Sequence, residues 1–255
     1  MGGGSKSGTG RGSGPVRAYL NAYNLAQSGL WVMVLVITIK ALLADVHHYV
    51  GVWTEVGPAT KLAVGGAWLE LVHVTLGLAG GSVSSAFWQN FGRSFVLFAI
   101  VDAFNTPKGL AWLPTLLLAW SGGELIRYPF YLLGSNAPPL LVWLRYSAFL
   151  VLYPLGMASE VALLLHTLPE AKAAVENRDR FCVRLPGAEE WRAFNFYYFL
   201  VFGLLVLYPF AIPYMFFYMV KQRTKRLGGN KDGNEGEAAR VAVPAGSSRK
   251  SRKAE

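Results

Sequence analysis

Apolar residues gather into six long runs, and polar residues gather between the runs and at the two ends of the chain. The runs cover about 25–44, 59–79, 84–102, 110–133, 139–167 and 194–220. Each is close to the ~20 residues that an α-helix needs to cross about 30 Å of hydrocarbon. The pattern therefore predicts an all-α, polytopic membrane protein, built as a six-transmembrane-helix bundle.

The polar segments divide the chain into three parts. Residues 1–16 are rich in Gly and Ser, 168–193 form the one sizeable polar loop, and the segment after 221 is basic and polar. Compositions of this kind at the ends are typical of disordered chain. We therefore expect a disordered leader (1–16), a six-span membrane domain (17–221) and a disordered cytosolic tail (222–255).

The net charge of +9 sits entirely in the two ends. Residues 1–24 hold three basic residues and no acidic one, residues 221–255 hold ten basic and four acidic residues, and residues 25–220 hold eleven of each. Basic flanks favour the cytosolic side of a membrane, so we expect both termini in the cytosol and an even number of spans. Because the apolar body has no basic face, the sequence argues against a nucleic-acid partner.

Cysteine usage and the chain ends narrow the possibilities further. Cys182 is the only cysteine, which excludes an intrachain disulfide and a multi-cysteine metal site. No apolar core directly follows the N-terminal segment, so we expect no cleaved signal peptide. The chain ends in SRKAE, where Arg252 and Lys253 resemble a weakened dilysine signal for return to the endoplasmic reticulum. Basic tails also end this way by chance.

Ionisable residues interrupt the apolar runs, and each costs about 3 kcal/mol in hydrocarbon even on permissive scales. Glu124 and Arg127 are three residues apart, a spacing that allows an ion pair on one helix, and such a pair can be purely structural. Glu70 and His73 share that spacing, but a Glu-x-x-His metal site in a helical bundle needs a second copy. We therefore expect no metal. Further ionisable residues inside the runs include Arg93, Arg145, Glu160 and His166.

The stretch RYSAFLVLYPLGMASE carries an ionisable pair on one helical face. Tyr153 and Glu160 are seven residues apart, about 20° short of two turns and about 10.5 Å along the axis. Pro154 cannot donate to the carbonyl of Leu150, so we expect a kink or opening there. Gly156 leaves room for a ligand near the backbone. The pattern favours a pocket; the alternative is an interfacial Tyr153 and a helix-end Glu160 in water.

Four stretches carry a resemblance to a known family. YLNAYNLAQSGLW, LELVHVTLGLAGGS, WSGGELIRYPFYLL and LRYSAFLVLYPLGMASE follow one another between about 17 and 221. In this order they resemble the very-long-chain (3R)-3-hydroxyacyl-CoA dehydratase family, also known as protein tyrosine phosphatase-like proteins, in its plant PASTICCINO2 type. The resemblance implies a six-span protein of the endoplasmic reticulum membrane. It also implies the third step of very-long-chain fatty acid elongation, in which 3-hydroxyacyl-CoA becomes trans-2-enoyl-CoA without a cofactor.

The resemblance also implies site residues and partners. Tyr153 and Glu160 match the catalytic residues of the Y-P-x-G-x-x-x-E pattern. The motif glycine matches Gly156, and the supporting arginines match Arg93, Arg127 and Arg145, with Arg93 in the least distinctive surroundings. The implied partners are the 3-hydroxyacyl-CoA substrate, membrane lipids and the other elongation enzymes, namely the condensing enzyme and the ketoacyl and enoyl reductases.

Residue chemistry agrees with an elimination of water. The reaction needs a base for the proton on C2 and an acid for the departing 3-hydroxyl group. A neutral tyrosine is a proton donor at pH 7, which suits Tyr153 to the acid and Glu160 to the base. The reverse assignment also fits the sequence. Arginines and the basic ends are expected to hold the CoA phosphates near the cytosolic face.

Other functions fit the sequence less well. A phosphatase loop that starts at Cys182 needs an arginine six residues on, where the chain has Ala188. A condensing enzyme of the elongase type needs a His-x-x-His-His box and therefore a histidine at Ala44. A transporter also carries charges within its spans, but no internal repeat is visible. A non-catalytic role, as a phosphotyrosine-binding protein or a scaffold of the elongase complex, stays open as the alternative.

Overall fold

The computed structural model describes residues 14–44, 49–178, 182–184 and 192–227. Along these residues the chain forms six helical bodies, some of them built from more than one helix. The bodies are α1 (Gly14–Ala44), α2 (Val50–Thr75), α3 (Val83–Ser94) with the π-helix η1 (Phe95–Asp102), α4 (Trp112–Leu133), α5 (Pro139–Ser147) with α6 (Phe149–Arg178), and α7 (Phe196–Phe202) with the π-helix η4 (Gly203–Leu207) and α8 (Tyr208–Leu227). Two 3-10 turns, η2 (Thr106–Gly109) and η3 (Gly134–Asn136), flank α4. The predicted all-α class is confirmed, with one addition. This is a short antiparallel hairpin of β1 (Cys182–Arg184) and β2 (Arg192–Asn195), in which Cys182 pairs with Asn195.

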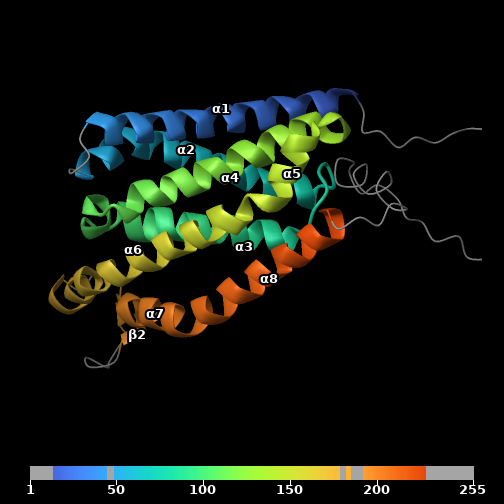
Figure 1. Cartoon of the computed structure of the whole chain (residues 1–255). Coiled ribbons are helices and arrows are strands. Elements are labelled where there is room, and N and C mark those ends of the chain that lie inside the picture. The colour runs from blue at the N-terminus through green and yellow to red at the C-terminus, as the bar shows by residue number, and fades with distance from the viewer. Residues whose placement is uncertain (1–13, 45–48, 179–181, 185–191, 228–255) are drawn as a thin grey trace, which may run out of the picture.

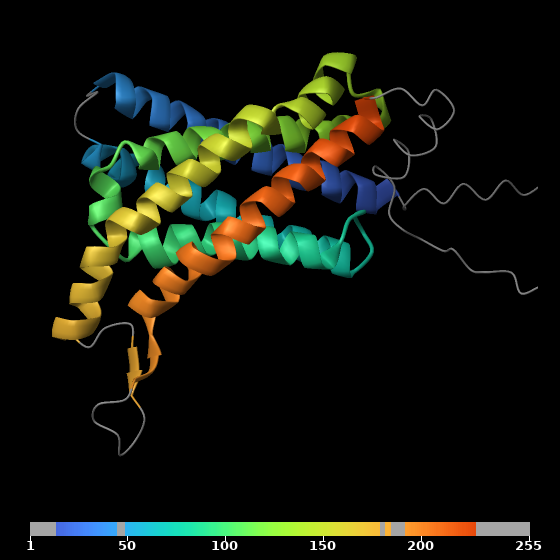
Figure 2. The same ribbon diagram turned by 60° about the horizontal axis from the view of Figure 1, so that its bottom comes forward.

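The helical bodies run side by side along one long axis (Figure 1). α1 packs on α2 and α4, and α4 packs in turn on α6. α7 and α8 form the outermost layer, and α8 crosses the bundle obliquely (Figure 2). The start of α1 and the end of α8 lie at the same end of the bundle, as an even number of antiparallel bodies requires.

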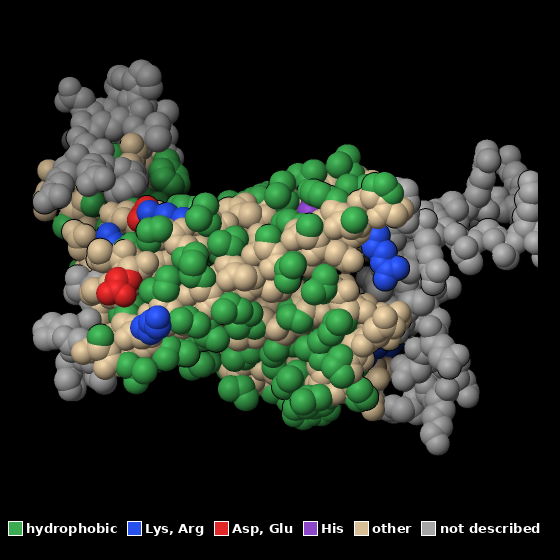
Figure 3. Space-filling view, turned by 90° about the horizontal axis from the view of Figure 1, so that it is seen from above, with side chains coloured by type: hydrophobic (Ala, Val, Ile, Leu, Met, Phe, Trp, Pro, Cys, Tyr) green, Lys and Arg blue, Asp and Glu red, His purple; other side chains and the backbone are tan. Residues whose placement is uncertain are grey.

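Apolar side chains fill the interior and also cover the outside. Trp31, Leu117 and Tyr128 are among the fully buried residues between α1 and α4. On α8 several large side chains point outward, with Phe210 75% and Tyr214 70% exposed. On the face drawn in Figure 3, charged side chains gather toward the two ends and apolar ones cover the middle. Three of the bodies, 14–44, 139–177 and 196–227, are long and apolar enough to cross a membrane.

Several helices extend beyond the ends that the apolar runs predict. α1 begins at Gly14 and α8 continues to Leu227. α6 continues eleven residues beyond 167 to Arg178, so the predicted polar loop begins as helix. This extension is held because Ala171 and Val175 are buried. The other parts of the predicted leader and tail, residues 1–13 and 228–255 with the terminal SRKAE, lie outside the described residues.

Candidate active site

Four charged side chains form one network between three helices. The guanidinium of Arg127 on α4 donates two hydrogen bonds to Glu70 on α2, both at 2.7 Å. Its Nε donates to Glu124 at 2.8 Å, and the other oxygen of Glu124 accepts from Arg93 on α3. The predicted contact between Glu124 and Arg127 is confirmed. Two carboxylates thus balance two guanidinium groups, which removes the cost of an unpaired charge in the interior.

Tyr128 completes this network. Its hydroxyl accepts from Nη2 of Arg127 at 3.0 Å and donates to Glu70. Tyr128 is fully buried, and Glu124 is only 1% exposed. Because Glu70 binds Arg127, it is not arranged with His73 as a metal-ligand pair; His73 instead contacts the Tyr19 hydroxyl through Nε2 at 2.9 Å. Among the described residues, no group of three or more potential metal ligands lies together.

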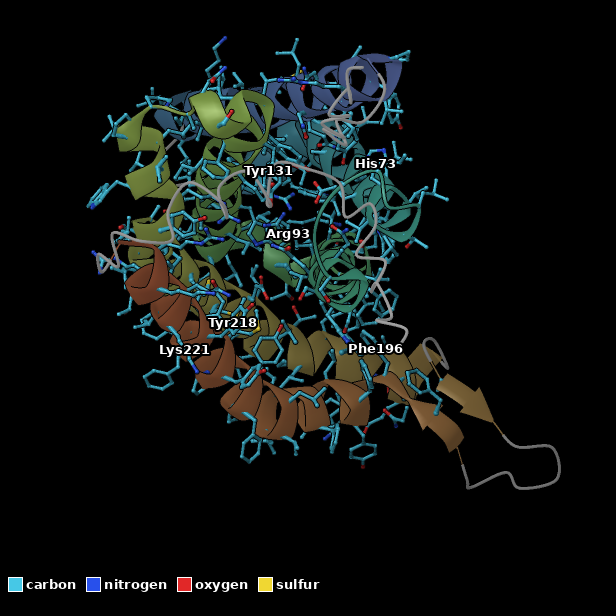
Figure 4. The ribbon with its side chains drawn as sticks, turned by 90° about the vertical axis from the view of Figure 1, so that its right-hand side faces the viewer. His73, Arg93, Tyr131, Phe196, Tyr218 and Lys221 are labelled. Atoms are coloured by element: carbon cyan, nitrogen blue, oxygen red, sulfur yellow. The ribbon has the colours of Figure 1, made fainter. Side chains whose placement is uncertain are left out.

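Arg93 lies between two indole rings near the middle of the bundle. Figure 4, which looks along the bundle, places Arg93 inside the ring of helices. Its guanidinium carbon is 5.9 Å from the centre of the Trp31 ring and 5.7 Å from that of Trp120. Both contacts are at cation–π distance. Trp120 also donates a hydrogen bond to a second polar group, on α6.

Glu160 is that second group, and it is buried in α6 with 7% of its surface exposed. Its Oε1 accepts a hydrogen bond from Nε1 of Trp120, and its Oε2 accepts one from the hydroxyl of Tyr208, both at 3.3 Å. Among the described residues no cation pairs with it directly. The structure therefore contradicts the interpretation of Glu160 as a helix-end carboxylate in water, because α6 continues for 18 residues beyond it.

Tyr153 lies on the same side of α6 and also faces α8. Its hydroxyl donates to the carbonyl oxygen of Ile212 at 3.2 Å, and its ring stacks on Phe216 with centroids 6.2 Å apart. α6 is continuous through Pro154, so the helix does not open there, and a kink at Pro154 stays a prediction. A break in the helix lies at Ala148, between α5 and α6 and less than two turns before Pro154. There the N–H of Val151 bonds the carbonyl of Ala148, three residues back, as in a 3-10 turn.

Gly156 lies where α4 and α6 approach each other. It is buried, and a Cβ built on it would lie 3.7 Å from the Cβ of Ala119 on α4. On the facing helix, a Cβ on Gly122 would lie 3.3 Å from Leu152. Small residues on both sides therefore allow the close packing that brings Trp120 to Glu160. The space expected at Gly156 is taken up by α4.

Arg145 joins neither polar network. It is half-buried in the last turn of α5 and, in the part of the chain that the structure describes, forms no hydrogen bond or ion pair. The residues beside it contact the basic end of α8. Arg223 donates to Ser147 at 3.2 Å, and Arg226 lies 6.0 Å from the centre of the Tyr146 ring. Figure 4 shows Tyr218 and Lys221 on the same stretch of α8.

Sequence reasoning missed both hydrogen-bond donors to Glu160. Trp120 opens a quoted motif, WSGGELIRYPFYLL, but an indole in an apolar run gives no sign of its partner. Tyr208 carried a signal, because the tetrapeptide VLYP occurs twice, at 151–154 and at 206–209. The two copies supply Tyr153 and Tyr208, which lie on antiparallel helices and both face the interface of α6 with α8.

Comparisons with known proteins agree over most of the chain. The family model described as protein tyrosine phosphatase-like protein, PTPLA, matches residues 65–229. The chain is 36% identical to the very-long-chain (3R)-3-hydroxyacyl-CoA dehydratase PASTICCINO 2B of Oryza sativa subsp. japonica over 227 residues, 88% of this chain and 99% of the relative. It is 33% identical to PASTICCINO 2 of Arabidopsis thaliana (84% and 95%) and 28% identical to very-long-chain (3R)-3-hydroxyacyl-CoA dehydratase 2 of Homo sapiens (84% and 83%). No solved structure matches the chain.

Proposed function

Because the chain belongs to the PTPLA family of protein tyrosine phosphatase-like proteins, we propose that it is a hydro-lyase that dehydrates very-long-chain 3-hydroxyacyl-CoA. The product is trans-2-enoyl-CoA, and the reaction is the third step of fatty acid elongation. Relatives that align with nearly their whole length bear the name of this activity. The other elongation enzymes are its expected partners, since they make its substrate and consume its product.

One observation carries the assignment of the site. A buried carboxylate, Glu160, accepts hydrogen bonds on both oxygens, pairs with no cation among the described residues and shares a helix face with Tyr153. The carboxylates of Glu70 and Glu124 instead bind arginine. A buried carboxylate held by neutral donors is suited to take up and release a proton.

In the proposed reaction Glu160 takes the proton from C2 of the thioester. The electron pair of that C–H bond forms the C2–C3 double bond, and the C3–O bond breaks. Tyr153 gives its proton to the departing hydroxyl group, which leaves as water. The proton on Glu160 then returns to the tyrosinate, so the enzyme is restored and the substrate has lost one water molecule. The reacting carbons would lie where α6 faces α8, because both side chains point there.

The arginines then have different roles. Arg93 and Arg127 hold α2, α3 and α4 together through Glu70 and Glu124, and Arg93 also packs on Trp120 beside Glu160. Neither carries an uncompensated charge for a phosphate. We propose that Arg145 and the basic end of α8 bind the CoA phosphates at the end of the bundle where α1 begins and α8 ends.

We propose that all six helical bodies cross the endoplasmic reticulum membrane, with both termini in the cytosol. α2 and α4 are not among the helices that are long and apolar enough to cross a membrane by composition alone. Their charged side chains pair with each other inside the bundle. Such pairing lets a charged helix lie in hydrocarbon with its polar groups turned inward. The hairpin then lies on the lumenal side, and η3 lies on the cytosolic side.

This arrangement predicts the labelling of the single cysteine. In sealed microsomes, a membrane-impermeant maleimide should leave Cys182 in the hairpin unmodified, and detergent should expose it. A Ser135→Cys variant in a Cys182→Ser background should be labelled without detergent, because Ser135 is exposed in η3 at the opposite end. Labelling of Cys182 in sealed microsomes, with the membrane shown to be intact, would refute the proposed arrangement.

Direct conversion by the purified protein tests the function. With a (3R)-3-hydroxyacyl-CoA of about 20 carbons in mixed micelles, we expect a product lighter by one water that co-elutes with the trans-2-enoyl-CoA. Formation should need no added metal or nucleotide. A folded, monodisperse protein that forms no enoyl product from acyl chains across the very-long range would overturn the proposal.

A further inference from the structure

Both oxygens of the Glu160 carboxylate are occupied by hydrogen-bond donors from other helices. Trp120 on α4 donates to Oε1, and Tyr208 on α8 donates to Oε2, each at 3.3 Å. A glutamate side chain has three rotatable bonds, and a single donor would leave the carboxylate free to turn. Two donors from two different helices fix the direction in which each oxygen points.

Tyr208 is placed by an irregular backbone just before it. The π-helix η4 ends at Leu207, and Pro209, which has no N–H, cannot bond the carbonyl of Leu205. π-helical segments often mark functional positions, because they turn a side chain away from the regular helical face. Tyr208 is half-buried, whereas the other two tyrosines of α8, Tyr214 and Tyr218, are exposed. Its contact with Glu160 is therefore specific to this position.

We propose that Tyr208 is a positioning residue for the reaction, and that it fixes the Glu160 carboxylate against the C2 proton. The inference rests on the proposed function and deepens it. Hydrogen bonds of this kind are often long without substrate and shorten when substrate binds. The oxygen that accepts the proton must point at C2 within a narrow range, and a small misplacement of a reacting group is costly in rate.

The two tyrosines of the repeated VLYP tetrapeptide have different partners. Tyr153 on α6 donates to a backbone carbonyl of α8, at Ile212. Tyr208 on α8 donates to a side chain of α6, at Glu160. The Tyr208 hydroxyl is engaged with the proposed base, whereas the Tyr153 hydroxyl bonds a backbone carbonyl, a contact that the departing hydroxyl group of the substrate would replace. Each helix thus supplies one tyrosine, one for the proton transfer to oxygen and one to hold the base.

The test uses Tyr208→Phe in the purified full-length protein. Loss of a hydrogen bond to a carboxylate should lower kcat by about 10- to 100-fold. The KM for the acyl-CoA should change by less than about threefold, because the hydroxyl does not contact the substrate. The deuterium isotope effect is the ratio of kcat for the unlabelled substrate to kcat for the substrate deuterated at C2. It should be larger in the variant than in the wild type, because proton removal becomes slower relative to the other steps. Tyr214→Phe, an exposed tyrosine on the same helix, should match the wild type in all three.

Trp120→Phe provides the second variant. It keeps an aromatic ring against Arg93 and removes the donor to the other oxygen together with part of the indole volume, so a smaller kcat and a larger isotope effect are expected again. The inference is overturned if wild type dehydrates its substrate and Tyr208→Phe is folded with an unchanged kcat. It is also overturned if kcat falls without any rise in the isotope effect, since that is the result of a general structural role. Absence of dehydration by the wild type would instead refute the proposed function.

Discussion

Glu160→Gln should lower kcat for dehydration by about 10²- to 10⁴-fold, the range that one positioned acid or base contributes. Glutamine has nearly the same shape as glutamate. Its amide oxygen can still accept a hydrogen bond from Trp120 or Tyr208, so the packing around α6 should persist. The amide cannot take up the C2 proton. KM should change little, and a thermal midpoint close to that of the wild type would show that the loss is chemical.

The matched control is Glu176→Gln, which removes a carboxylate from the same helix. Glu176 is 56% exposed at the side chain and lies 4.0 Å from Lys172, also exposed. Exposed pairs of this kind contribute little. Its turnover should equal that of the wild type. A Glu160→Gln variant with normal turnover would remove Glu160 from the mechanism.

Glu124→Leu should have the largest effect on stability. Glu124 is 1% exposed and accepts hydrogen bonds from both Arg93 and Arg127. Leucine fills a similar volume but leaves Arg93 in the interior without an opposite charge. Breaking a buried ion pair in this way costs about 3–5 kcal/mol. We expect a clearly lower thermal midpoint in detergent, together with a loss of folded protein on purification.

Asp102→Leu is the control for that result. It removes the partner of Lys61, at 2.7 Å, in a pair whose side chains are both more than one third exposed. The expected cost is at most about 1 kcal/mol. If Glu124→Leu were no less stable than Asp102→Leu, the charged network would not be what holds α3 to α4.

The helical bodies were largely predictable because hydrophobic runs of about 20 residues are a strong signal. Their ends were not, because polar residues extend a helix when tertiary contacts hold them. At Glu170, for example, the carboxylate accepts hydrogen bonds from the backbone N–H groups of Asn105 and Thr106. No pattern near position 170 indicates a partner 65 residues away. The same reason explains why the predicted loop at 168–193 begins as helix.

The candidate site was predictable only in part. Helical spacing placed Tyr153 and Glu160 on one face, and their contacts with α8 agree with that geometry. The partners of Glu160 depend on how α4 and α8 pack against α6, which spacing along α6 does not contain. Gly156 was interpreted as space for a ligand, but in the structure it packs against Ala119 of α4.

The roles of the three arginines were also predictable only in part. From the sequence, Arg93, Arg127 and Arg145 were all interpreted as supporting arginines of the site. The structure divides them into two that are paired inside the bundle and one that lies near its basic end. That division depends on Glu70, a residue on α2 that is 57 positions from Arg127 and so gives no local signal.

The most direct test of the central claim is the dehydration rate of Tyr153→Phe, measured beside Tyr214→Phe on the same (3R)-3-hydroxyacyl-CoA. Both changes remove one tyrosine hydroxyl. Only Tyr153 shares a helix face with Glu160, whereas Tyr214 is 70% exposed on α8. The account predicts a fall in kcat of about 10²-fold or more for Tyr153→Phe and normal turnover for Tyr214→Phe. Equal and near-normal turnover of the two variants would contradict it, and would make Tyr153 a packing residue of the interface between α6 and α8.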